Sequence, residues 1–444
     1  MIIFILFIIL GLIFAWFYFF REPRFSLDKL LFSLWSFSIG VAQFRLSPYE
    51  NSWGAKFWLV LALFFGVFYL TKIFFDKFLT KKYFLRPHPT LPLKQGKGKL
   101  WKLNNKLFFW LLFLMSLASI AANVYIFSRF GTLPILSSLP DKMRFIINRE
   151  VFGLWEYLSL LPRIFIPLTF LYLIIAKPKN NWPKILAVLN IILGFAILSL
   201  YASRLVIILP ILLSYFSYLI LNIKRINSKK IIIASSVAVL VVLIVAVSIP
   251  AIRQYITYRD YYSDIEYTPF TYLADLSQLK IPAQLNFLIP LYLIPSFNLQ
   301  AMARAVDFFN FNNFYFGRYS LSVFDSALRI FQLPVFAIAI PWKEMFLPWW
   351  VTATFIFSPW ADFGWLGLVL VAVFWGALFS GVYFLATKKP SLLSVLLFSY
   401  FSFVAIMSIY TNYFQRPELY LDLLLIFSVG LIRINGDRKR REAP

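Results

Sequence analysis

The chain has 444 residues, of which 61% are hydrophobic and 14% charged, and its formal net charge is +24. A soluble domain is about 45–50% apolar and about 25% charged, so the surplus of apolar residues here must face lipid. The chain has no cysteine and one histidine, His88, which excludes disulfide frameworks, thiolate metal sites, cysteine nucleophiles and most histidine-based chemistry.

Eleven apolar stretches recur along the chain, each about as long as a helix needs to cross the ~30 Å hydrocarbon core of a bilayer. Residues 2–20 lack both a basic start and a small-residue cleavage site, so we expect them to form the first span rather than a signal peptide. The sequence therefore predicts an all-α fold, a single polytopic bundle over residues 1–444. The predicted spans are residues 2–20, 27–44, 53–75, 107–127, 151–175, 185–202, 205–221, 231–249, 362–386, 391–409 and 418–434.

The connections between these spans form two sets that differ in charge. In one set, Lys and Arg crowd the short connections, and in particular residues 76–106, 222–230 and the tail from 435. Short basic connections stay in the cytoplasm, so we expect a multi-pass protein of the cell (cytoplasmic) membrane with its N-terminus outside and its C-terminus in the cytoplasm. The basic residues are then explained by the topology of the chain and by contact with anionic membrane lipid. Nothing in the pattern predicts a nucleic-acid partner.

One connection on the outer side is far longer than the others. Residues 250–361 contain aromatic and aliphatic residues throughout, so we expect this large extracytoplasmic loop to be folded and to have a purpose. Its apolar stretch 281–299 is broken by Pro282, Pro290 and Pro295 and is predicted to form helices at the membrane interface. The loop is our candidate for a lid over a site that opens into the outer leaflet.

Arginine is unexpectedly frequent on the outer side. A guanidinium group binds a phosphate through two parallel hydrogen bonds. An arginine near lipid that the topology of the chain does not require indicates a functional role. We therefore predict that these arginines bind an anionic lipid head group such as a diphosphate. Arg204 is the first candidate, because it follows Ser203 in a turn too short for a soluble loop. The others are Arg129, Arg144, Arg253, Arg259, Arg304 and Arg318.

Each of these predictions has a simpler alternative. Arg253 and Arg259 flank acidic residues and would form exposed ion pairs of little energy in that alternative. Asp362 is a candidate catalytic base for a sugar hydroxyl, but an aspartate at the start of a span equally caps its helix. Aromatic side chains of the loop, such as Tyr315 and Tyr319, would stack on sugars or serve as packing and interface anchors.

Three segments of the chain resemble the Wzy-type O-antigen, capsule and exopolysaccharide repeat-unit polymerases. Residues 129–136, followed by Arg144, are similar to the first outer loop of that family. Residues 201–204 (YASR) resemble its step from a small residue to arginine between two spans. Residues 352–367 resemble its threonine-then-DFGxxG entry into the span after the large loop. The number of spans and the single large loop extend the likeness along most of the chain.

The resemblance implies a glycosyltransferase that polymerises oligosaccharide repeat units carried on undecaprenyl or another polyprenyl diphosphate at the outer face of the membrane. It implies no metal or other cofactor, and it admits a chain-length regulator protein as a partner. Related O-antigen ligases carry a histidine in the large loop, and this chain has none there. A flippase for lipid-linked oligosaccharide is the competing class, although Arg163 is almost the only charge recognised within a span and no paired halves are visible. A non-catalytic assembly partner also stays open.

Overall fold

A computed structural model shows a helical protein. It describes residues 2–85, 102–103, 105–140, 142–143, 146, 154–176, 178, 180–223, 226–258, 270–279, 281–310, 313–325, 328, 334, 352–388, 390–430 and 433–434. The longer helices are α1 (Ile2–Phe20), α2 (Leu27–Ala42), α3 (Ala55–Leu85), α4 (Asn105–Phe130), α7 (Pro162–Ala176), α8 (Asn181–Ser199), α9 (Arg204–Leu221), α10 (Ser228–Tyr258), α12 (Ile289–Phe308), α16 (Phe357–Lys388), α17 (Leu392–Met407) and α18 (Pro417–Gly430). The short elements are β1 (Lys102–Leu103), η1 (Pro134–Leu136), α6 (Leu154–Ser159), α11 (Thr271–Ser277), η2 (Ala283–Leu288), α13 (Arg318–Leu321), η4 (Ser322–Phe324), η5 (Tyr413–Gln415) and β2 (Arg433–Ile434).

The all-α prediction is confirmed, and each predicted span overlaps one helix, except span 151–175, which overlaps both α6 and α7. Among the described residues, eight helices are long and apolar enough to cross a membrane: α1, α3, α4, α6 with α7, α8, α9, α10 and α16. The remaining three predicted spans fall on α2, α17 and α18, which are shorter. The protein is therefore a polytopic membrane protein by the composition and length of its helices.

Some boundaries differ from the prediction for identifiable reasons. The stretch expected to be one span over residues 151–175 is broken between α6 and α7, where Pro162 occupies the first position of α7. Helix α10 continues through Pro250 to Tyr258, so the predicted large loop begins with helical residues. The predicted helices over residues 281–299 are present as η2 and α12, and α12 packs against α2 and α3.

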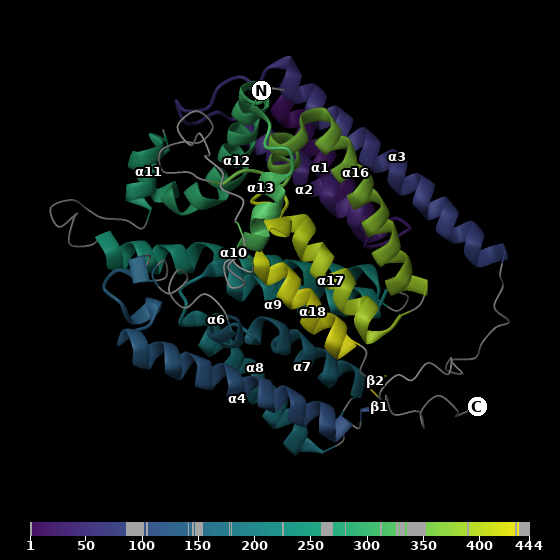
Figure 1. Ribbon diagram of the computed structural model, residues 1–444, viewed down its shortest axis with the longest axis vertical. Helices are drawn as coiled ribbons and strands as arrows, with labels where there is room; N and C mark the ends of the chain where they lie inside the picture. The colour runs from purple at the N-terminus through teal and green to yellow at the C-terminus, as the bar shows by residue number, and fades with distance from the viewer. Residues whose placement is uncertain are drawn as a thin grey trace.

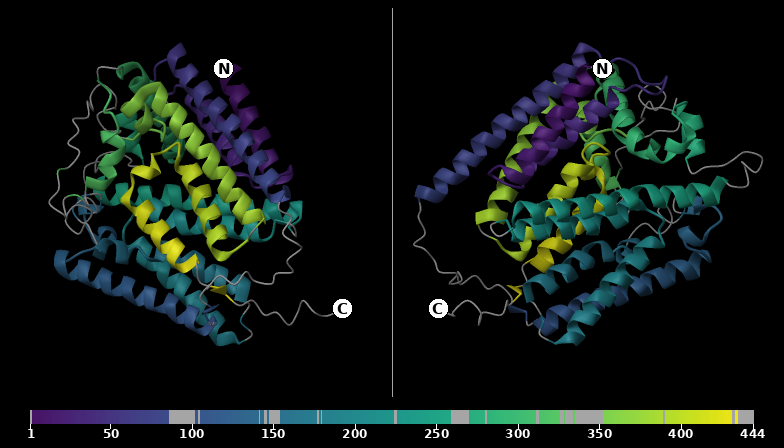
Figure 2. Two further views of the ribbon diagram at one scale, coloured as in Figure 1. Left: turned by 45° about the vertical axis from the view of Figure 1, so that its right-hand side comes forward. Right: turned by 180° about the vertical axis from the view of Figure 1, so that it is seen from behind.

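The helices form two outer groups with a third group between them (Figures 1 and 2). Helices α1, α2, α3 and α16 pack together on one side, with α1 against α2 and α3 against α16. Helices α4, α7 and α8 form the opposite group. Helix α9 packs against α7 of that group and against α10 and α17, and α17 in turn packs against α2 of the first group. The interior is aromatic: Trp375 lies 4.4 Å from the Phe355 ring between centroids, and the Trp35 indole donates a 2.9 Å hydrogen bond to Ser408 Oγ.

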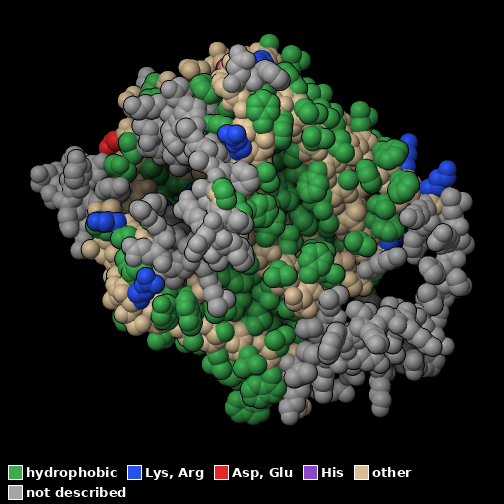
Figure 3. Space-filling view, viewed as in Figure 1, with side chains coloured by type: hydrophobic (Ala, Val, Ile, Leu, Met, Phe, Trp, Pro, Cys, Tyr) green, Lys and Arg blue, Asp and Glu red, His purple; other side chains and the backbone are tan. Residues whose placement is uncertain are grey.

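The outer surface of the bundle is suited to lipid. Only 11% of α1 and 17% of the apolar window of α10 are buried, although both are among the most apolar helices of the chain. Figure 3 shows hydrophobic side chains over most of the visible described face, with few charged groups among them. An apolar surface of this extent is stable only if lipid covers it.

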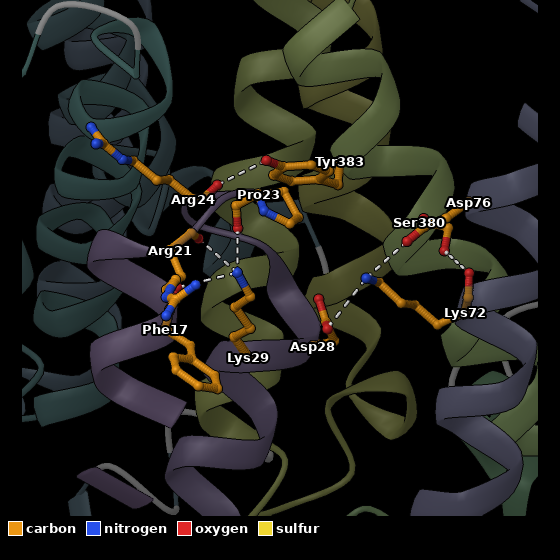
Figure 4. A network of polar contacts seen from close by, with 10 residues as sticks. All are labelled: Phe17, Arg21, Pro23, Arg24, Asp28, Lys29, Lys72, Asp76, Ser380 and Tyr383. Atoms are coloured by element: carbon orange, nitrogen blue, oxygen red, sulfur yellow. Dashed lines mark hydrogen bonds and ion pairs between the residues drawn. The ribbon is translucent and has the colours of Figure 1, made fainter. Parts of the chain in front are cut away.

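The connections gather at two opposite ends of the bundle. At one end, β1 pairs in parallel with β2, which brings the segment before α4 beside the C-terminal segment. Figure 4 shows further contacts at that end: Tyr383 donates to the Arg24 carbonyl oxygen. Lys29 donates to the carbonyl oxygens of Phe17 in α1 and of Arg21 and Pro23 just after α1, at 3.2, 2.7 and 2.7 Å. Lys72 of α3 lies 3.3 Å from Asp28 and 2.8 Å from Asp76. The strand pair therefore brings the end of the predicted basic connection 76–106 beside the segment that precedes the basic tail.

Candidate functional site at the arginine-bearing end

Arg204 is the first residue of α9, at the end of the bundle opposite β1 and β2. The turn before it is tight, since Ala202 is fully buried with a positive φ of 50°, and Ser203 occupies the N-cap position. The guanidinium carbon lies 5.9 Å from the centre of the Tyr410 ring. Among the described residues, no carboxylate lies within ion-pair distance of Arg204. A cation at the positive end of a helix dipole is unfavourable by itself, so this position favours a bound anion.

A second predicted arginine reaches the same turn from a different helix. Arg253 of α10 donates from Nη1 to the Ala202 carbonyl oxygen at 3.4 Å, which places its guanidinium group two residues from Arg204. The loop after Arg129 is fastened there as well, because Ile135 N donates to the Leu200 carbonyl oxygen at 3.1 Å. Arg129 itself is exposed at the end of α4, over the Phe130 ring. We call the set Arg204, Arg253 and Tyr410 the arginine turn.

The other predicted arginines lie elsewhere or outside the described residues. Arg304 of α12 donates to the Tyr49 carbonyl oxygen at 3.1 Å, and burial lowers its pKa from the ordinary value. Arg318 begins α13 and is exposed. Arg144 and Arg259 are outside the described residues. The structure thus brings together Arg204 and Arg253, which lie 49 positions apart in the sequence.

Asp362 is fully buried and serves as a cap, but for a helix other than its own. Its Oδ1 accepts from Tyr319 N at 2.9 Å, and its Oδ2 accepts from Ser320 N at 2.8 Å and from the Ser320 hydroxyl at 2.5 Å. These amides belong to the first turn of α13, which an aspartate stabilises through hydrogen bonds and the helix dipole. The prediction that Asp362 caps its own helix is therefore wrong, because Asp362 lies inside α16 and caps α13, while a catalytic role for Asp362 stays a prediction.

The glycines after Asp362 have a structural reason. Gly364 has φ 54° and ψ −128°, a conformation that interrupts α16 and that side chains rarely adopt. The interruption leaves the carbonyl oxygens of Ala361 and Asp362 available to Tyr315 N and Phe316 N, each at 3.0 Å. A side chain at Gly367 would collide with the carbonyl oxygen of Pro359. This corner fixes residues 315–316 of the large loop onto α16.

Two of the tyrosines predicted to contact sugars line this corner. The rings of Tyr315 and Tyr319 are stacked with centroids 5.9 Å apart, and the Tyr319 carbonyl oxygen accepts from Gln415 Nε2 at 2.9 Å. Burial raises the pKa of both hydroxyls, so both remain neutral at physiological pH. Tyr261 and Tyr262 lie outside the described residues. The hydrogen bond from Gln415 joins α13 to the segment that follows Tyr410.

Sequence analysis missed the partner of Arg163. Arg163 of α7 and Asp422 of α18 are both buried, with Nε and Oδ1 2.9 Å apart, and the Tyr400 hydroxyl donates to the other Asp422 oxygen at 2.9 Å. Arg163 is thus not almost alone among mid-span charges, since Asp422 lies inside the predicted span 418–434. A carboxylate within a span was the available signal, because such residues are rarely placed there without a partner.

Glu50 was also overlooked among the outer carboxylates. Its Oε2 accepts from the Tyr292 hydroxyl at 2.5 Å and from Ser47 N at 3.0 Å, which ties α12 to the connection between α2 and α3. Burial raises the pKa of Glu50 above its ordinary value of 4.5, and the hydrogen bonds from Tyr292 and Ser47 oppose that shift. The Tyr292 hydroxyl accepts in turn from Leu46 N at 2.8 Å. Glu50 is therefore a titratable residue whose hydrogen bond with Tyr292 holds α12 against the connection between α2 and α3.

Comparison with known proteins adds no assignment. No family model, curated protein or solved structure matches the chain. In the part of the chain that the structure describes, no group of three or more histidine, aspartate and glutamate side chains is placed to hold a metal ion. The chemistry of the site must therefore be argued from its own arginines, tyrosines and carboxylates.

Proposed function

We propose that the protein is a membrane glycosyltransferase that polymerises oligosaccharide repeat units carried on a polyprenyl diphosphate, as the resemblance to the Wzy-type polymerases implies. In this proposal all eleven predicted spans cross the cytoplasmic membrane, including α2, α17 and α18. The basic end with β1 and β2 faces the cytoplasm, and the arginine turn faces the outer leaflet. The N-terminus is then outside and the C-terminus inside.

The observation that carries the proposal is the arginine turn. Arg204 begins α9, and Arg253 of α10 donates to the carbonyl oxygen of Ala202, two residues before Arg204. Arg204 has no carboxylate partner among the described residues. A diphosphate at the membrane surface supplies the missing negative charge. During transfer, the same groups stabilise the charge that builds on the departing diphosphate oxygen, which is the largest electrostatic change in the reaction.

The remaining parts have roles that fit this chemistry. The hydroxyl of the acceptor sugar attacks the anomeric carbon of the donor while the bond to the diphosphate breaks. Segments of the large loop, with the stacked Tyr315 and Tyr319, would hold donor and acceptor in one orientation. The α13 corner that Asp362 caps would keep these tyrosines in place.

One observation favours a second candidate, a transporter of lipid-linked oligosaccharide. The buried pair of Arg163 and Asp422 is the kind of intramembrane charge that transporters place on a substrate or proton path. Both bonds made by Asp422, to Arg163 and to Tyr400, also fit a purely structural role. We therefore rank transport second, and the same reconstituted system distinguishes the two functions.

The test uses the full-length protein in liposomes, with lipid-linked oligosaccharide isolated from host cells that lack this chain. We expect longer lipid-linked glycans without ATP and in the presence of a chelator. Movement of the substrate across the bilayer without elongation would replace this proposal by the transporter. Neither elongation nor movement, by protein that is folded and correctly inserted, would exclude both.

Arg204 is the residue to vary. Arg204→Ala should abolish elongation, and Arg204→Lys should impair it strongly, because lysine keeps the charge but loses the two-pronged geometry. Arg21→Ala is the matched control, since Arg21 is an exposed arginine at the opposite end of the bundle. Near-normal chain growth by a well-folded Arg204→Ala protein would remove the arginine turn from the site.

A further inference from the structure

Two exposed arginines lie at the α13 corner, where Asp362 of α16 holds the first turn of α13. Arg318 is the first residue of α13, and Arg416 directly follows η5. Among the described residues, no carboxylate lies within ion-pair distance of either arginine. Asp362 itself is fully buried, and its oxygens already accept from the amides of α13. Sequence analysis did not single out Arg416, although it lies in the short connection between the last two predicted spans.

One hydrogen bond joins the two segments that carry these arginines. Gln415 Nε2 donates to the Tyr319 carbonyl oxygen at 2.9 Å, and each arginine is the direct chain neighbour of one of these two bonded residues. A second contact joins the same segments, since the rings of Phe324 and Tyr420 lie 5.6 Å apart between centroids, and η4 packs against η5. Two different outer connections therefore bring the two unpaired arginines to one corner of the molecule.

The backbone that carries both arginines is held by hydrogen bonds of its own. Asp362 fixes the first turn of α13, as described above. On the other side, Asn412 Oδ1 accepts from Phe414 N at 3.1 Å at the start of η5, and Arg416 N donates to the Tyr413 carbonyl oxygen at 3.0 Å. Binding groups on a backbone that is already ordered lose less conformational entropy when a ligand arrives, so a pre-organised corner of this kind suits a binding site.

Aromatic rings accompany the two arginines. The stacked rings of Tyr315 and Tyr319 are partly exposed, and Arg318 N donates to the Tyr315 carbonyl oxygen at 3.1 Å, which places Arg318 in the turn between the two tyrosines. The Tyr319 hydroxyl makes no hydrogen bond within the described part of the chain. Burial raises the pKa of that hydroxyl and the charge of Arg416 opposes the rise, so the hydroxyl is a neutral donor at physiological pH.

This set of groups fits a sugar that carries a carboxylate. An aromatic side chain offers an apolar face on which the C–H face of a sugar ring can lie. A guanidinium group binds a carboxylate through two parallel hydrogen bonds, which an uncharged sugar hydroxyl cannot match. A tyrosine hydroxyl supplies one further donor to the same carboxylate.

The corner also lies within reach of the arginine turn. Tyr410 contacts Arg204, and residues 410–416 lead from there through η5 to Arg416. Such a segment spans at most about 22 Å when fully extended, and the η5 turn shortens it. An oligosaccharide whose diphosphate is bound at the arginine turn can therefore place one of its sugars at the α13 corner.

We propose that Arg318 and Arg416 bind a carboxylate-bearing sugar of the repeat unit, so that the substrate is an acidic oligosaccharide; this inference rests on the proposed function. The sugar lies against the ring of Tyr315 or Tyr319, and its carboxylate accepts from the guanidinium groups and from the Tyr319 hydroxyl. The two arginines select the substrate and do not act on the bond that is made or broken.

The first experiment measures binding, which needs no transfer reaction. Full-length protein in nanodiscs of phosphatidylcholine, a lipid without net charge, is titrated with tetragalacturonate and with maltotetraose as its neutral match. We expect the acidic probe to bind at least about tenfold more tightly, because hydrogen bonds to charged groups contribute that much. The preference should shrink as the salt concentration rises. Equal affinity for the two probes would overturn the inference.

The second experiment varies the two arginines. Arg318→Gln and Arg416→Gln should each weaken the binding of tetragalacturonate about tenfold and change that of maltotetraose less than about twofold. Lysine at either position should keep part of the preference, because it keeps the charge but not the planar fork. Arg21→Gln is the matched control, since Arg21 is an exposed arginine at the opposite end of the bundle.

Two results with these variants would contradict the proposal. Glutamine variants that melt at the wild-type temperature and bind tetragalacturonate as tightly as wild type would remove both arginines from any sugar site. Weaker binding of phosphatidylglycerol vesicles by the variants, with unchanged binding of tetragalacturonate, would assign the arginines to lipid head groups instead.

The natural substrate gives an independent test that separates this inference from the proposed function. Mass spectrometry of the lipid-linked oligosaccharide from host cells that lack this chain should reveal a carboxylated sugar, and reducing its carboxyl group should slow elongation at least about tenfold. A repeat unit without any acidic group, elongated by the wild-type protein, would overturn the inference and leave the proposed function intact. Arginine-dependent binding of tetragalacturonate by a protein that elongates nothing would overturn the proposed function and leave the acidic-sugar site.

Discussion

The buried pair of Arg163 and Asp422 gives the sharpest prediction about stability. Arg163 is 4% exposed and Asp422 is fully buried, so removing the carboxylate in Asp422→Ala leaves a guanidinium group uncompensated in the interior. Breaking one side of a buried ion pair costs about 3–5 kcal/mol. The Tyr400 hydroxyl also loses its acceptor, and a hydrogen bond to a charged group contributes about 1.5–3 kcal/mol. Because these contributions overlap, we expect a total loss of about 3–5 kcal/mol.

The measurement is the free energy of unfolding in detergent micelles, followed by tryptophan fluorescence during denaturant titration. The double variant Arg163→Met with Asp422→Leu removes both charges and should recover most of the lost stability, because well-packed apolar residues replace a buried pair at little cost. Tyr400→Phe should lie between wild type and Asp422→Ala. An Asp422→Ala protein within about 1 kcal/mol of wild type would refute the reasoning, since it would mean that water or lipid head groups already solvate Arg163.

Three further predictions follow from the ends of the bundle. Since the chain lacks cysteine, Lys81→Cys should be labelled only from the cytoplasm and Ser138→Cys only from outside in intact cells, and the reverse pattern would invert the topology. The raised pKa of Glu50 means that folding disfavours its ionised form, so wild-type stability should fall as pH rises above 4.5 through the folded-state pKa. Glu50→Gln keeps the oxygen that accepts from Tyr292 and should flatten that slope in melting experiments, whereas an unchanged slope would assign the pH dependence to other groups. Asp362→Ala should cost about 1–2 kcal/mol as a lost cap and make the α13 segment more sensitive to protease, and equal protease resistance would contradict the capping role.

The sequence by itself determined the membrane character, the all-helical fold and the approximate positions of the long apolar helices. These properties are local: an apolar run of sufficient length must be helical in lipid, where its backbone groups can only bond within the segment. The clustering of Lys and Arg in short connections likewise predicted which connections share a side, and the pairing of β1 with β2 agrees with it. Pro162 also indicated a helix start inside the predicted span 151–175, although the prediction treated that stretch as one helix.

The sequence also selected Arg204 and Asp362, but for Asp362 it left two interpretations open. Only the folded chain reveals that this carboxylate caps α13, a helix 41 or more positions earlier, and not its own helix. The role of Gly364 also depends on the folded chain. Its positive φ interrupts α16, and this matters because Tyr315 N and Phe316 N then bond to the carbonyl oxygens of Ala361 and Asp362.

Tertiary structure alone decided which charges meet. Arg163 and Asp422 are 259 positions apart. Arg253 reaches the turn before Arg204 from the far end of α10. No periodicity in the sequence encodes such pairs, since they depend on how α7, α9, α10 and α18 pack. A buried charge needs a partner wherever the chain can bring one, and the packing of the helices determines which residue that is.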